Sequence, residues 1–436
     1  MKKNINFVSL ISKRLLVLSF TIGLISCEND PICESENFVD SKLLTINKYK
    51  ISEEEAKENL LNFLNASKIS TYGNASTRMI KSFEPILTKK QSVSTYATEN
   101  SLFIDIDTLM YLINFENDEG FAFVSADKRT DAIFAIIDQG NLSVDSLNKV
   151  DNPGFNSFIE KAIIKGINDI NNYDESWDIQ QNVYTYGGNY VLAPQFWYSA
   201  DMVTPKLKTK WGQGESYNIY CPGRYPTGCV MTATAQILSY FQVINSIQYY
   251  DNGSYYSIPL NWSQIMFCSE REFGMLVYNH SPAASQQVAH LMRYLGLTLD
   301  AEYSSSVTYA FIEDALTWMR NNGLSSTTDL IDFDSETMFS ALKNGKLIFA
   351  RGQTGQGAAH AWVIDGGHKY LLKDNRILIY AHCNWGFDGL CDGYYLGNVF
   401  DTSVDKRWER ENGIDVVDGT RNSNYNYYQK ISIVGM

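Results

Sequence analysis

A polar, asparagine-rich stretch from Ile170 to Gly188 divides this chain into halves with different patterns of apolar residues. The stretch has few apolar residues that could anchor it to a core, which is typical of an interdomain linker. The length of 436 residues also exceeds that of an ordinary single domain, which is about 100–200 residues. The sequence therefore predicts two domains, residues 28–188 and 189–436, after an N-terminal segment 1–27.

The first half predicts a small α+β domain. Ser52 and Glu55 form the S-x-x-E pattern of a capping box, and apolar residues on one helical face follow it. A second amphipathic helix is expected after Pro153 and Gly154, whereas residues 66–94 lack a period and are predicted to be a loop. Short apolar or alternating runs predict the strands of an antiparallel sheet at Leu102–Ile106, Leu109–Phe115, Phe121–Ala126 and Ala132–Ile137.

The second half predicts helices first and strands last. Apolar residues three and four apart predict helices at Val230–Gln242, Ala284–Leu295, Phe311–Asn321 and Ser335–Leu342. Strands are predicted at Leu347–Ala350, Ala361–Asp365, Tyr370–Leu372, Ile377–Ala381 and Ile431–Val434. This order favours an α+β domain in which helices pack on an antiparallel sheet.

The N-terminus has the charge-then-apolar order of an export signal, with basic residues before the run Leu15–Ile25. That run is shorter than the roughly 20 residues that span a bilayer. It ends in Leu24-Ile25-Ser26-Cys27, which resembles a bacterial lipobox. We therefore expect a lipidated Cys27 as the mature N-terminus and an outer-membrane or surface lipoprotein of the cell envelope. An ordinary signal peptide is the alternative.

Charge and cysteine content restrict the partners. A formal net charge of −13 argues against phosphate-driven binding, so nucleic acid is not an expected partner. Without Cys27, the chain keeps cysteines whose pairing their spacing does not reveal: Cys33, Cys221, Cys229, Cys268, Cys383 and Cys391. Nothing in the sequence indicates a cofactor.

Cys229 is the candidate nucleophile. It follows Pro226-Thr227-Gly228, where a turn gives way to a predicted helix rich in small residues. Backbone amides and the positive end of a helix dipole stabilise a thiolate, so we expect its pKa to fall from about 8.5 toward neutrality. A buried structural cysteine is the alternative.

Other residues would complete a peptidase site. His360 begins a predicted strand after the glycine-rich run 352–357 and would accept the thiol proton and return it to the leaving amine. Asn384 could orient its imidazole, and Trp385 could shield that bond from water. The Gln213 side chain could help the Cys229 backbone amide bind the developing oxyanion.

These segments together resemble the streptopain family of papain-like cysteine peptidases. The resemblance rests on WGQGESYN from Trp211, GCVMTATAQ from Gly228, HAWVIDG from His360 and NWGFDGLCDGY from Asn384. The upstream segment from Asn114 to Asp127 is similar to the family's inhibitory propeptide. The resemblance implies a papain-like fold, an intramolecular inhibitor, nucleophile Cys229, base His360, oxyanion helper Gln213 and support from Asn384 and Trp385.

The chain departs from the family pattern at the rim of the site. Ala359 stands where a glycine usually precedes the histidine, and Phe387-Asp388 replaces the usual Trp-Gly. We expect Gly228, Ala359 and Trp362 to contact protein or peptide substrates. The prediction is a zymogen endopeptidase that becomes active, and is released from its membrane lipid, when residues 28–188 are removed by cleavage in or near the linker.

Other interpretations explain fewer of these features. A catalytically silent surface lipoprotein that binds host or envelope proteins would keep the fold without the activity. A transglutaminase-like enzyme would also use a thiolate and a histidine, but usually with an aspartate rather than Asn384. The sequence predicts no metal site, because His360, His368, His382, Cys383 and Cys391 show neither CxxC nor HExxH spacing.

Overall fold

The computed structural model describes residues 48–67, 78–87, 107–174, 184–186, 189–191, 197–353, 359–372, 375–400 and 429–436. Asn47–Met436 form a compact unit. Met1–Ile46, with the predicted export signal and Cys27, lie outside the described residues, as does the strand predicted at Leu102–Ile106. Among the described helices, none combines the length and apolar character that a membrane crossing requires.

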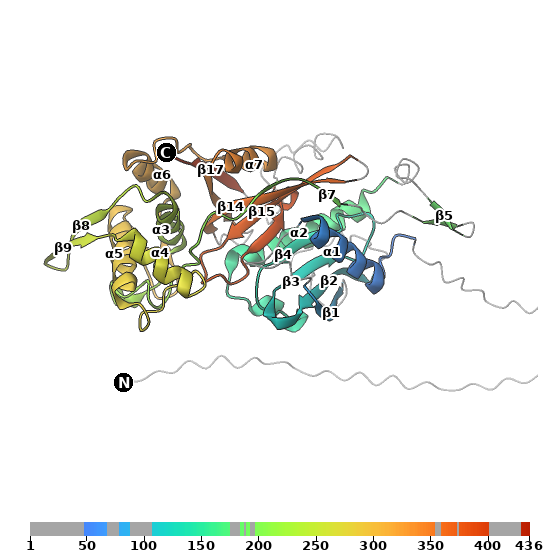
Figure 1. Cartoon of the computed structure of the whole chain (residues 1–436), viewed down its shortest axis with the longest axis horizontal. Helices are drawn as coiled ribbons and strands as arrows, with labels where there is room; N and C mark the ends of the chain where they lie inside the picture. Colours follow the sequence, from blue (N-terminus) through green and yellow to red (C-terminus); the bar gives the residue numbers. More distant parts are fainter. Residues whose placement is uncertain are drawn as a thin grey trace, which may run out of the picture. The chain divides into compact units, whose positions relative to one another are not determined.

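An antiparallel sheet of 11 strands runs through the unit (Figure 1). Its order is β1-β2-β3-β4-β16-β15-β14-β13-β17-β12, and β7 pairs with the far end of the long strand β14. Its strands are β1 (Ile80–Leu87), β2 (Thr108–Phe115), β3 (Phe121–Ser125), β4 (Ile133–Ile137), β7 (Trp197–Val203), β12 (Ile331–Asp332), β13 (Leu347–Gln353), β14 (Ala359–Leu372), β15 (Ile377–Asn384), β16 (Gly393–Leu396) and β17 (Lys430–Val434).

Short hairpins and helices complete the unit. The hairpins pair β5 (Tyr184–Tyr186) with β6 (Asn189–Val191), β8 (Ser246–Asp251) with β9 (Ser254–Pro259), and β10 (Glu302–Tyr303) with β11 (Thr308–Tyr309). The helices are α1 (Glu53–Ser67), α2 (Pro153–Asn171), α3 (Cys229–Phe241), α4 (Trp262–Arg271), α5 (Pro282–Thr298), α6 (Ile312–Asn321) and α7 (Ser335–Lys343).

Helix starts follow from the residues that precede them. At α1 the capping box is confirmed, because Ser52 N donates to Glu55 Oε2 at 2.9 Å and Glu55 N donates to Ser52 Oγ at 3.2 Å. At α2 the Asn152 side chain accepts a hydrogen bond from Phe155 N, and Pro153 occupies the first turn, where its missing N–H costs nothing.

The period-two alternation of β14 separates two hydrophobic cores. Ala361 and Val363 belong to a core with α3, α5 and α6, whereas Trp362 and Ile364 belong to a core with α1 and α2. Both α3 and α2 contact β14. The start of β14 therefore lies between a helix of the predicted peptidase half and a helix of the predicted pro-domain half.

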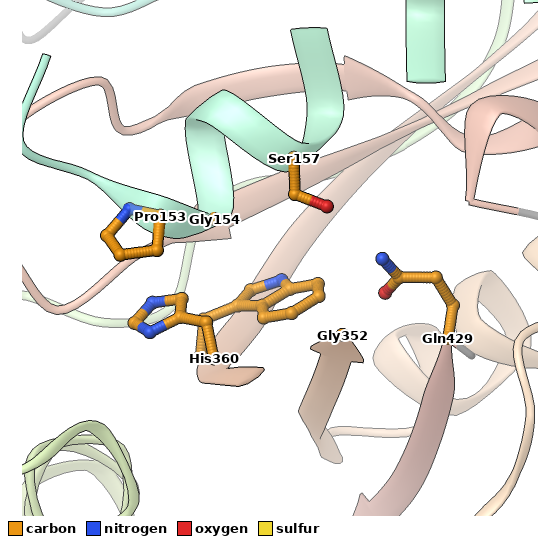
Figure 2. A pocket seen from close by; sticks show the side chains of 7 residues that line it. Pro153, Gly154, Ser157, Gly352, His360 and Gln429 are labelled. Atoms are coloured by element: carbon orange, nitrogen blue, oxygen red, sulfur yellow. The ribbon is translucent and has the colours of Figure 1, made fainter. Parts of the chain in front are cut away.

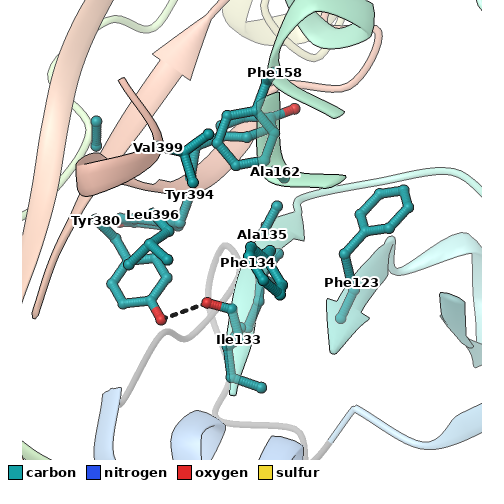
Figure 3. Close-up of a cluster of buried hydrophobic side chains, with 14 of the residues drawn as sticks. Phe123, Ile133, Phe134, Ala135, Phe158, Ala162, Tyr380, Tyr394, Leu396 and Val399 are labelled. Carbon is teal, nitrogen blue, oxygen red and sulfur yellow. Dashed lines mark hydrogen bonds between the residues drawn. The ribbon is translucent and has the colours of Figure 1, made fainter. Parts of the chain in front are cut away.

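The two halves share one sheet where β4 pairs with β16. Ala135, Ile136 and Ile137 lie opposite Tyr395, Tyr394 and Gly393. A side chain at Gly393 would meet Ile136 O at 2.4 Å, so only glycine fits this pairing. The core beneath is also shared, and Figure 3 shows the Tyr380 hydroxyl donating to Ile133 O at 2.8 Å.

The predicted α+β class, with helices packed on an antiparallel sheet, is confirmed. Some elements differ from the predictions. The loop predicted for residues 66–94 is wrong where β1 forms, because an edge strand with one partner tolerates Lys81, Glu84 and Pro85 and shows no clean alternation. The strands predicted at Ala361–Asp365 and Tyr370–Leu372 are parts of the single strand β14.

Candidate active site

Cys229 is the first residue of α3. Gly228 precedes it with φ of 92°, and a side chain there would meet Met231 Cε at 2.5 Å and Thr308 O at 3.0 Å. Burial raises the pKa of the Cys229 thiol, while the amides of Ala361, Val230 and Cys229 itself lower it. The net shift is opposite to the predicted fall, because burial outweighs the helix amides and no cationic partner contributes.

His360 lies at the start of β14 with its side chain buried. Its Nε2 contacts the Trp385 carbonyl oxygen at 2.9 Å and donates to it, which leaves Nδ1 as the nitrogen that can accept a proton. Burial lowers the pKa of His360 to about 4. Figure 2 shows the ring beside Pro153 and Gly154 at the beginning of α2, in a small pocket that Ser157, Gly352, Trp362 and Gln429 also line.

Cys229 and His360 lie at neighbouring positions, but their side chains have different partners. The thiol interacts with the Ala361 amide, one residue after His360. The imidazole instead shares a pocket with Trp362 and α2. Among the described residues, the hydrogen bonds of His360 include none to Cys229. Both groups are consequently neutral at pH 7 in this form.

Among the described residues, the hydrogen bonds of Asn384 go to groups other than the imidazole. Its Oδ1 accepts from Gln236 Nε2 at 2.8 Å and from Gly386 N at 3.2 Å, and its Nδ2 donates to Thr209 O at 2.7 Å. Gln236 Oε1 in turn accepts from Trp211 N at 3.1 Å. In this form Asn384 thus holds the segment that leads to Gln213, and the Trp385 carbonyl has the imidazole-orienting position predicted for Asn384.

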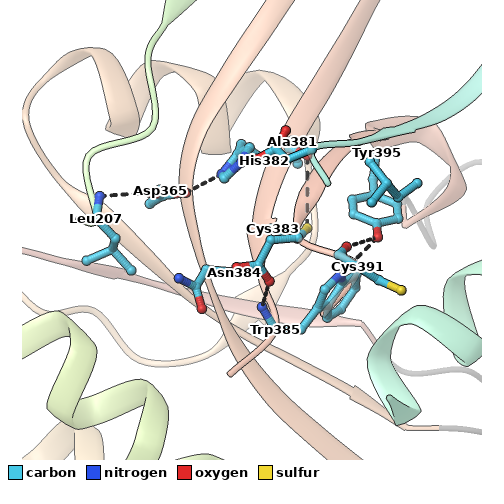
Figure 4. A network of polar contacts seen from close by, with 12 residues as sticks. Leu207, Asp365, Ala381, His382, Cys383, Asn384, Trp385, Cys391 and Tyr395 are labelled. Atoms are coloured by element: carbon cyan, nitrogen blue, oxygen red, sulfur yellow. Dashed lines mark hydrogen bonds and ion pairs between the residues drawn. The ribbon is translucent and has the colours of Figure 1, made fainter. Parts of the chain in front are cut away.

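Trp385 is buried beside the histidine. Its ring centroid lies 6.3 Å from that of His360 and 4.9 Å from that of Trp362. The indole Nε1 donates to Cys391 O and Tyr395 Oη, both at 3.0 Å. Figure 4 shows these bonds together with the polar contacts of the strands behind them.

Gln213 lies beside the turn that precedes the nucleophile. Its backbone oxygen accepts from Thr227 N at 2.9 Å, and its side chain is half-buried. The neighbouring Gly212 O is 3.5 Å from Thr232 Oγ1 in the first turn of α3. The loop that carries Gln213 is therefore attached to the same helix start that carries Cys229.

The predicted substrate-contact residues have different environments. Ala359 is exposed at the mouth of β14, and Gly228 lies against Cys229. Trp362 is only 2% exposed because it packs against Trp385 and α2. In this form Trp362 belongs to the hydrophobic core that includes residues of the pro-domain half, so a substrate cannot reach it.

Sequence reasoning missed two residues that contact the site. A side chain at Gly154 would meet the Trp385 ring at 2.2 Å and His360 Cδ2 at 2.8 Å. Asp388 interacts with the Gly212 amide and the Tyr217 hydroxyl, and burial raises its pKa to about 6. The signal for Asp388 was its departure from the family pattern, whereas no sequence signal marked Gly154.

His368 and His382 have polar partners on neighbouring strands or directly after them. His382 lies between Asp365 Oδ1 at 2.6 Å and Asp138 Oδ2 at 3.0 Å, and His368 contacts Ser199 Oγ at 2.8 Å. The cysteines of the described residues are free: Cys221, Cys229, Cys268, Cys383 and Cys391. Within the same residues, no group of three or more histidine, cysteine or acidic side chains could hold a metal ion.

Comparison with known proteins identifies a family that matches the segment containing this site. The Peptidase C10 family matches residues 211–395, from the segment that leads to Gln213 through the strand after Trp385. Residues 211–395 of the chain therefore belong to the Peptidase C10 family. The chain is a cysteine-type endopeptidase with an inhibitory propeptide, because the Spi protease inhibitor family matches residues 48–162.

Alignments with relatives of this peptidase extend over both halves of the chain. Streptopain from Streptococcus pyogenes serotype M28 is 24% identical, and the alignment covers 81% of this chain and 86% of streptopain. A fragment of prointerpain A from Prevotella intermedia aligns with a TM-score of 0.48 at 23% identity, covering 76% of this chain and 96% of the fragment. Active interpain A from the same organism aligns with a TM-score of 0.36 at 26% identity, covering 54% of this chain and 95% of that one.

Proposed function

We propose that this C10 peptidase is a secreted zymogen that hydrolyses peptide bonds inside proteins through a thioester on Cys229. One observation carries the proposal: α3 begins at Cys229 against the Ala361 amide, one residue from His360, within the segment that matches the family. A nucleophile at a helix start and a base at the head of the adjacent strand are the two parts that acyl transfer requires.

In this reaction each residue has a defined role, either in proton transfer or in stabilising the developing charge. Nδ1 of His360 takes the proton from Cys229 as sulfur attacks the substrate carbonyl. The Cys229 amide and the Gln213 side chain stabilise the oxyanion, and the imidazolium returns its proton to the leaving amine. Water then hydrolyses the thioester by the reverse proton transfers. In the precursor, the bond from His360 Nε2 to the Trp385 carbonyl already holds the tautomer that leaves Nδ1 free to accept the proton.

The pro-domain keeps the site inactive through α2. The start of α2 packs on His360 and Trp385, and Gly154 leaves no room between them (Figure 2). Asn152 is fully buried and donates to Leu390 O at 2.8 Å, which fixes this helix start on the peptidase half. Removal of residues 28–188, after cleavage in or near the linker, frees His360 to turn toward Cys229.

Digestion of casein by the chain from Glu28 onward tests this function. In reducing buffer the wild type should shorten near the linker and release peptides from casein, whereas Cys229→Ala should do neither. Cys268→Ala is the matched control, because Cys268 is another half-buried free cysteine and its loss should change nothing. Equal inertness of wild type and Cys229→Ala after treatment with an added protease would instead support a binding lipoprotein, and incorporation of an amine into casein would support a transferase.

Alkylation of Cys229 by iodoacetamide tests the latent state separately. In the precursor at pH 7 both the thiol and His360 are neutral, because burial raises the pKa of Cys229 and lowers that of His360 to about 4. The activated enzyme should react at least about tenfold faster, since a thiolate paired with an imidazolium persists at neutral pH. Equal rates, measured by mass spectrometry of the Cys229 peptide, would contradict inhibition through α2.

We also propose that the precursor is held in the cell envelope by a lipid on Cys27, supported by the lipobox-like Leu24-Ile25-Ser26-Cys27. Labelling of producing cells with a fatty-acid analogue should mark the wild-type precursor and not Cys27→Ser. Label on both, or on neither, would leave an ordinary export signal as the explanation.

A further inference from the structure

Asp388 follows Phe387 in the turn after Trp385, and the two side chains contact opposite sides of the site. The Phe387 ring lies 5.3 Å from the His360 ring, on the side of the base. Asp388 has φ of 53° and turns its carboxylate to Gly212, on the side of the oxyanion helper. This turn therefore contacts both the histidine and the loop that carries Gln213.

The contact between Asp388 and Gly212 is close. A Cβ on Gly212 would lie 2.3 Å from Asp388 Oδ2 and 2.7 Å from Oδ1, so the carboxylate occupies the space of a side chain at position 212. The Gly212 amide and the Tyr217 hydroxyl both interact with the carboxylate. Tyr217 can donate to it because the Tyr217 oxygen already accepts from Leu276 N at 2.9 Å.

These contacts restrain the residue before Gln213. Gly212 is held by Asp388 on one side and lies 3.5 Å, through its oxygen, from Thr232 Oγ1 on the other. Gln213 is attached next, through its oxygen, to Thr227 N. An oxyanion donor contributes only when its position is fixed before the charge develops, since movement during the reaction would cost the stabilisation it gives.

We propose that Asp388 is a positioning residue for the oxyanion helper Gln213, acting through Gly212. The proposal rests on the proposed peptidase function of Cys229 and Gln213. The contacts of Asp388 with Gly212 and Tyr217 lie between residues 211 and 395, within the segment that matches the peptidase family, and we expect them to persist when the pro-domain is removed.

Steady-state kinetics of Asp388→Asn, alone and combined with Gln213→Ala, test the proposal. All proteins are produced as the chain from Glu28 onward and activated by the same added protease. Activity is expressed per mole of Cys229 that iodoacetamide alkylates. Asparagine keeps the shape of the aspartate but lacks the negative charge with which the Gly212 amide and the Tyr217 hydroxyl interact. We expect kcat on a peptide substrate to fall about 10- to 100-fold with little change in KM, because only transition-state stabilisation is lost.

Other readouts separate positioning from general damage. The alkylation rate of Cys229 should stay at the wild-type value, because alkylation forms no oxyanion. Asp388→Asn should lower kcat little further in the Gln213→Ala background, since both changes remove the same stabilisation. Asp314→Asn is the matched control, as Asp314 is an exposed carboxylate on α6. Tyr217→Phe, which removes a donor to Asp388, should give a smaller fall of the same kind.

The outcomes that overturn the proposal are distinct from those that overturn the function. Wild-type kcat in Asp388→Asn, or an equal loss with and without Gln213, shows that Asp388 does not act through Gln213. If Asp388→Asn does not fold, a normal kcat in Tyr217→Phe overturns the proposal in the same way. An inactive wild type rejects the proposed peptidase function itself.

Discussion

Gly154 is one of the residues through which the pro-domain half contacts His360. Substitution by alanine would place a methyl group 2.2 Å from the Trp385 ring and 2.8 Å from His360 Cδ2, so the start of α2 must move away. We expect Gly154→Ala to destabilise the precursor by about 1–3 kcal/mol, as overpacked core positions do. Iodoacetamide should also alkylate Cys229 of this precursor several times faster than in the wild type.

Gly166 provides the control in the same helix. A side chain there would meet Leu109 Cδ1 at 3.5 Å, an ordinary contact, so Gly166→Ala should be tolerated and gain about 0.5–1 kcal/mol of helix stability. If both variants left the alkylation rate of Cys229 unchanged, inhibition would not depend on the fit of Gly154.

Single residues were predictable where local chemistry marks them. Cys229 at a helix start and His360 at a strand head follow from the sequence around each residue and from family resemblance. The hydrogen-bond partners of Asn384 were not predictable from the sequence. Gln236 and Thr209 lie 148 and 175 positions away, and any side-chain amide can bond to many groups. The pKa direction of Cys229 also failed, since burial by distant segments is not visible in a local motif.

Strands β4, β14 and β15 meet at a buried charge cluster. His382 on β15 lies between Asp365 of β14 and Asp138, which directly follows β4 of the pro-domain half. Burial lowers the pKa of His382, but the two carboxylates raise it to about 10, and the His382 charge helps to lower the pKa of Asp138. Arg78 and Lys210 also face Asp138. The cluster thus links the two halves electrostatically. Figure 4 shows its contact between His382 and Asp365.

The pH dependence of stability follows from these shifts. The His382 contribution is complete below its unfolded pKa of about 6.5 and is lost as pH rises toward 10. The Asp138 contribution is present above its unfolded pKa of about 3.9 and is lost as pH falls through its lowered folded pKa. Urea unfolding of the Cys229→Ala precursor should therefore show less stability at pH 9 than at pH 6, and a stability that does not fall over this range would contradict the assignment.

Removal of one partner should be costly. Asp138→Asn removes one of the two carboxylates that face the buried His382 charge, so we expect a loss of about 3 kcal/mol at pH 6 and a weaker fall toward pH 9. Asp201→Asn is the contrasting control, because Asp201 pairs with Lys343 at the surface, and exposed pairs contribute at most about 1 kcal/mol. Equal losses in the two variants would show that the buried cluster has no special weight.

Elements with strong local signals were predicted and elements defined by distant partners were not. The capping box of α1 and the apolar periodicity of α3, α5, α6 and α7 locate those helices closely. In contrast, β16 has only 4 residues and follows a glycine-containing turn, so its strand state depends on β15 and β4. The hairpin β8–β9 and helix α4 went unpredicted for a related reason: tyrosine, serine and asparagine there give weak periodicity.

At the scale of the whole molecule, the predicted sheets of the two halves form one sheet over a shared core. Cleavage of the linker breaks one peptide bond and leaves the β4–β16 hydrogen bonds and this apolar core intact. We therefore expect the two halves of Cys229→Ala, cut at a specific protease site introduced near residue 180, to co-elute in gel filtration at neutral pH. They should separate in denaturant, or when an added protease goes on to digest the pro-domain half. Immediate separation after cleavage would show that the β4–β16 pairing is too weak to hold them.

The fit of Gly393 against β4 has a consequence for how the sequence can vary. The backbone of Ile136 excludes any side chain at position 393, yet Ile136 belongs to the half that the proposed maturation removes. Once that half has gone, the neighbour that forbids a side chain on that face has gone too. Selection against substitutions at position 393 thus acts on folding of the precursor rather than on cleavage of the substrate. The working enzyme retains a restriction imposed by a partner it no longer has.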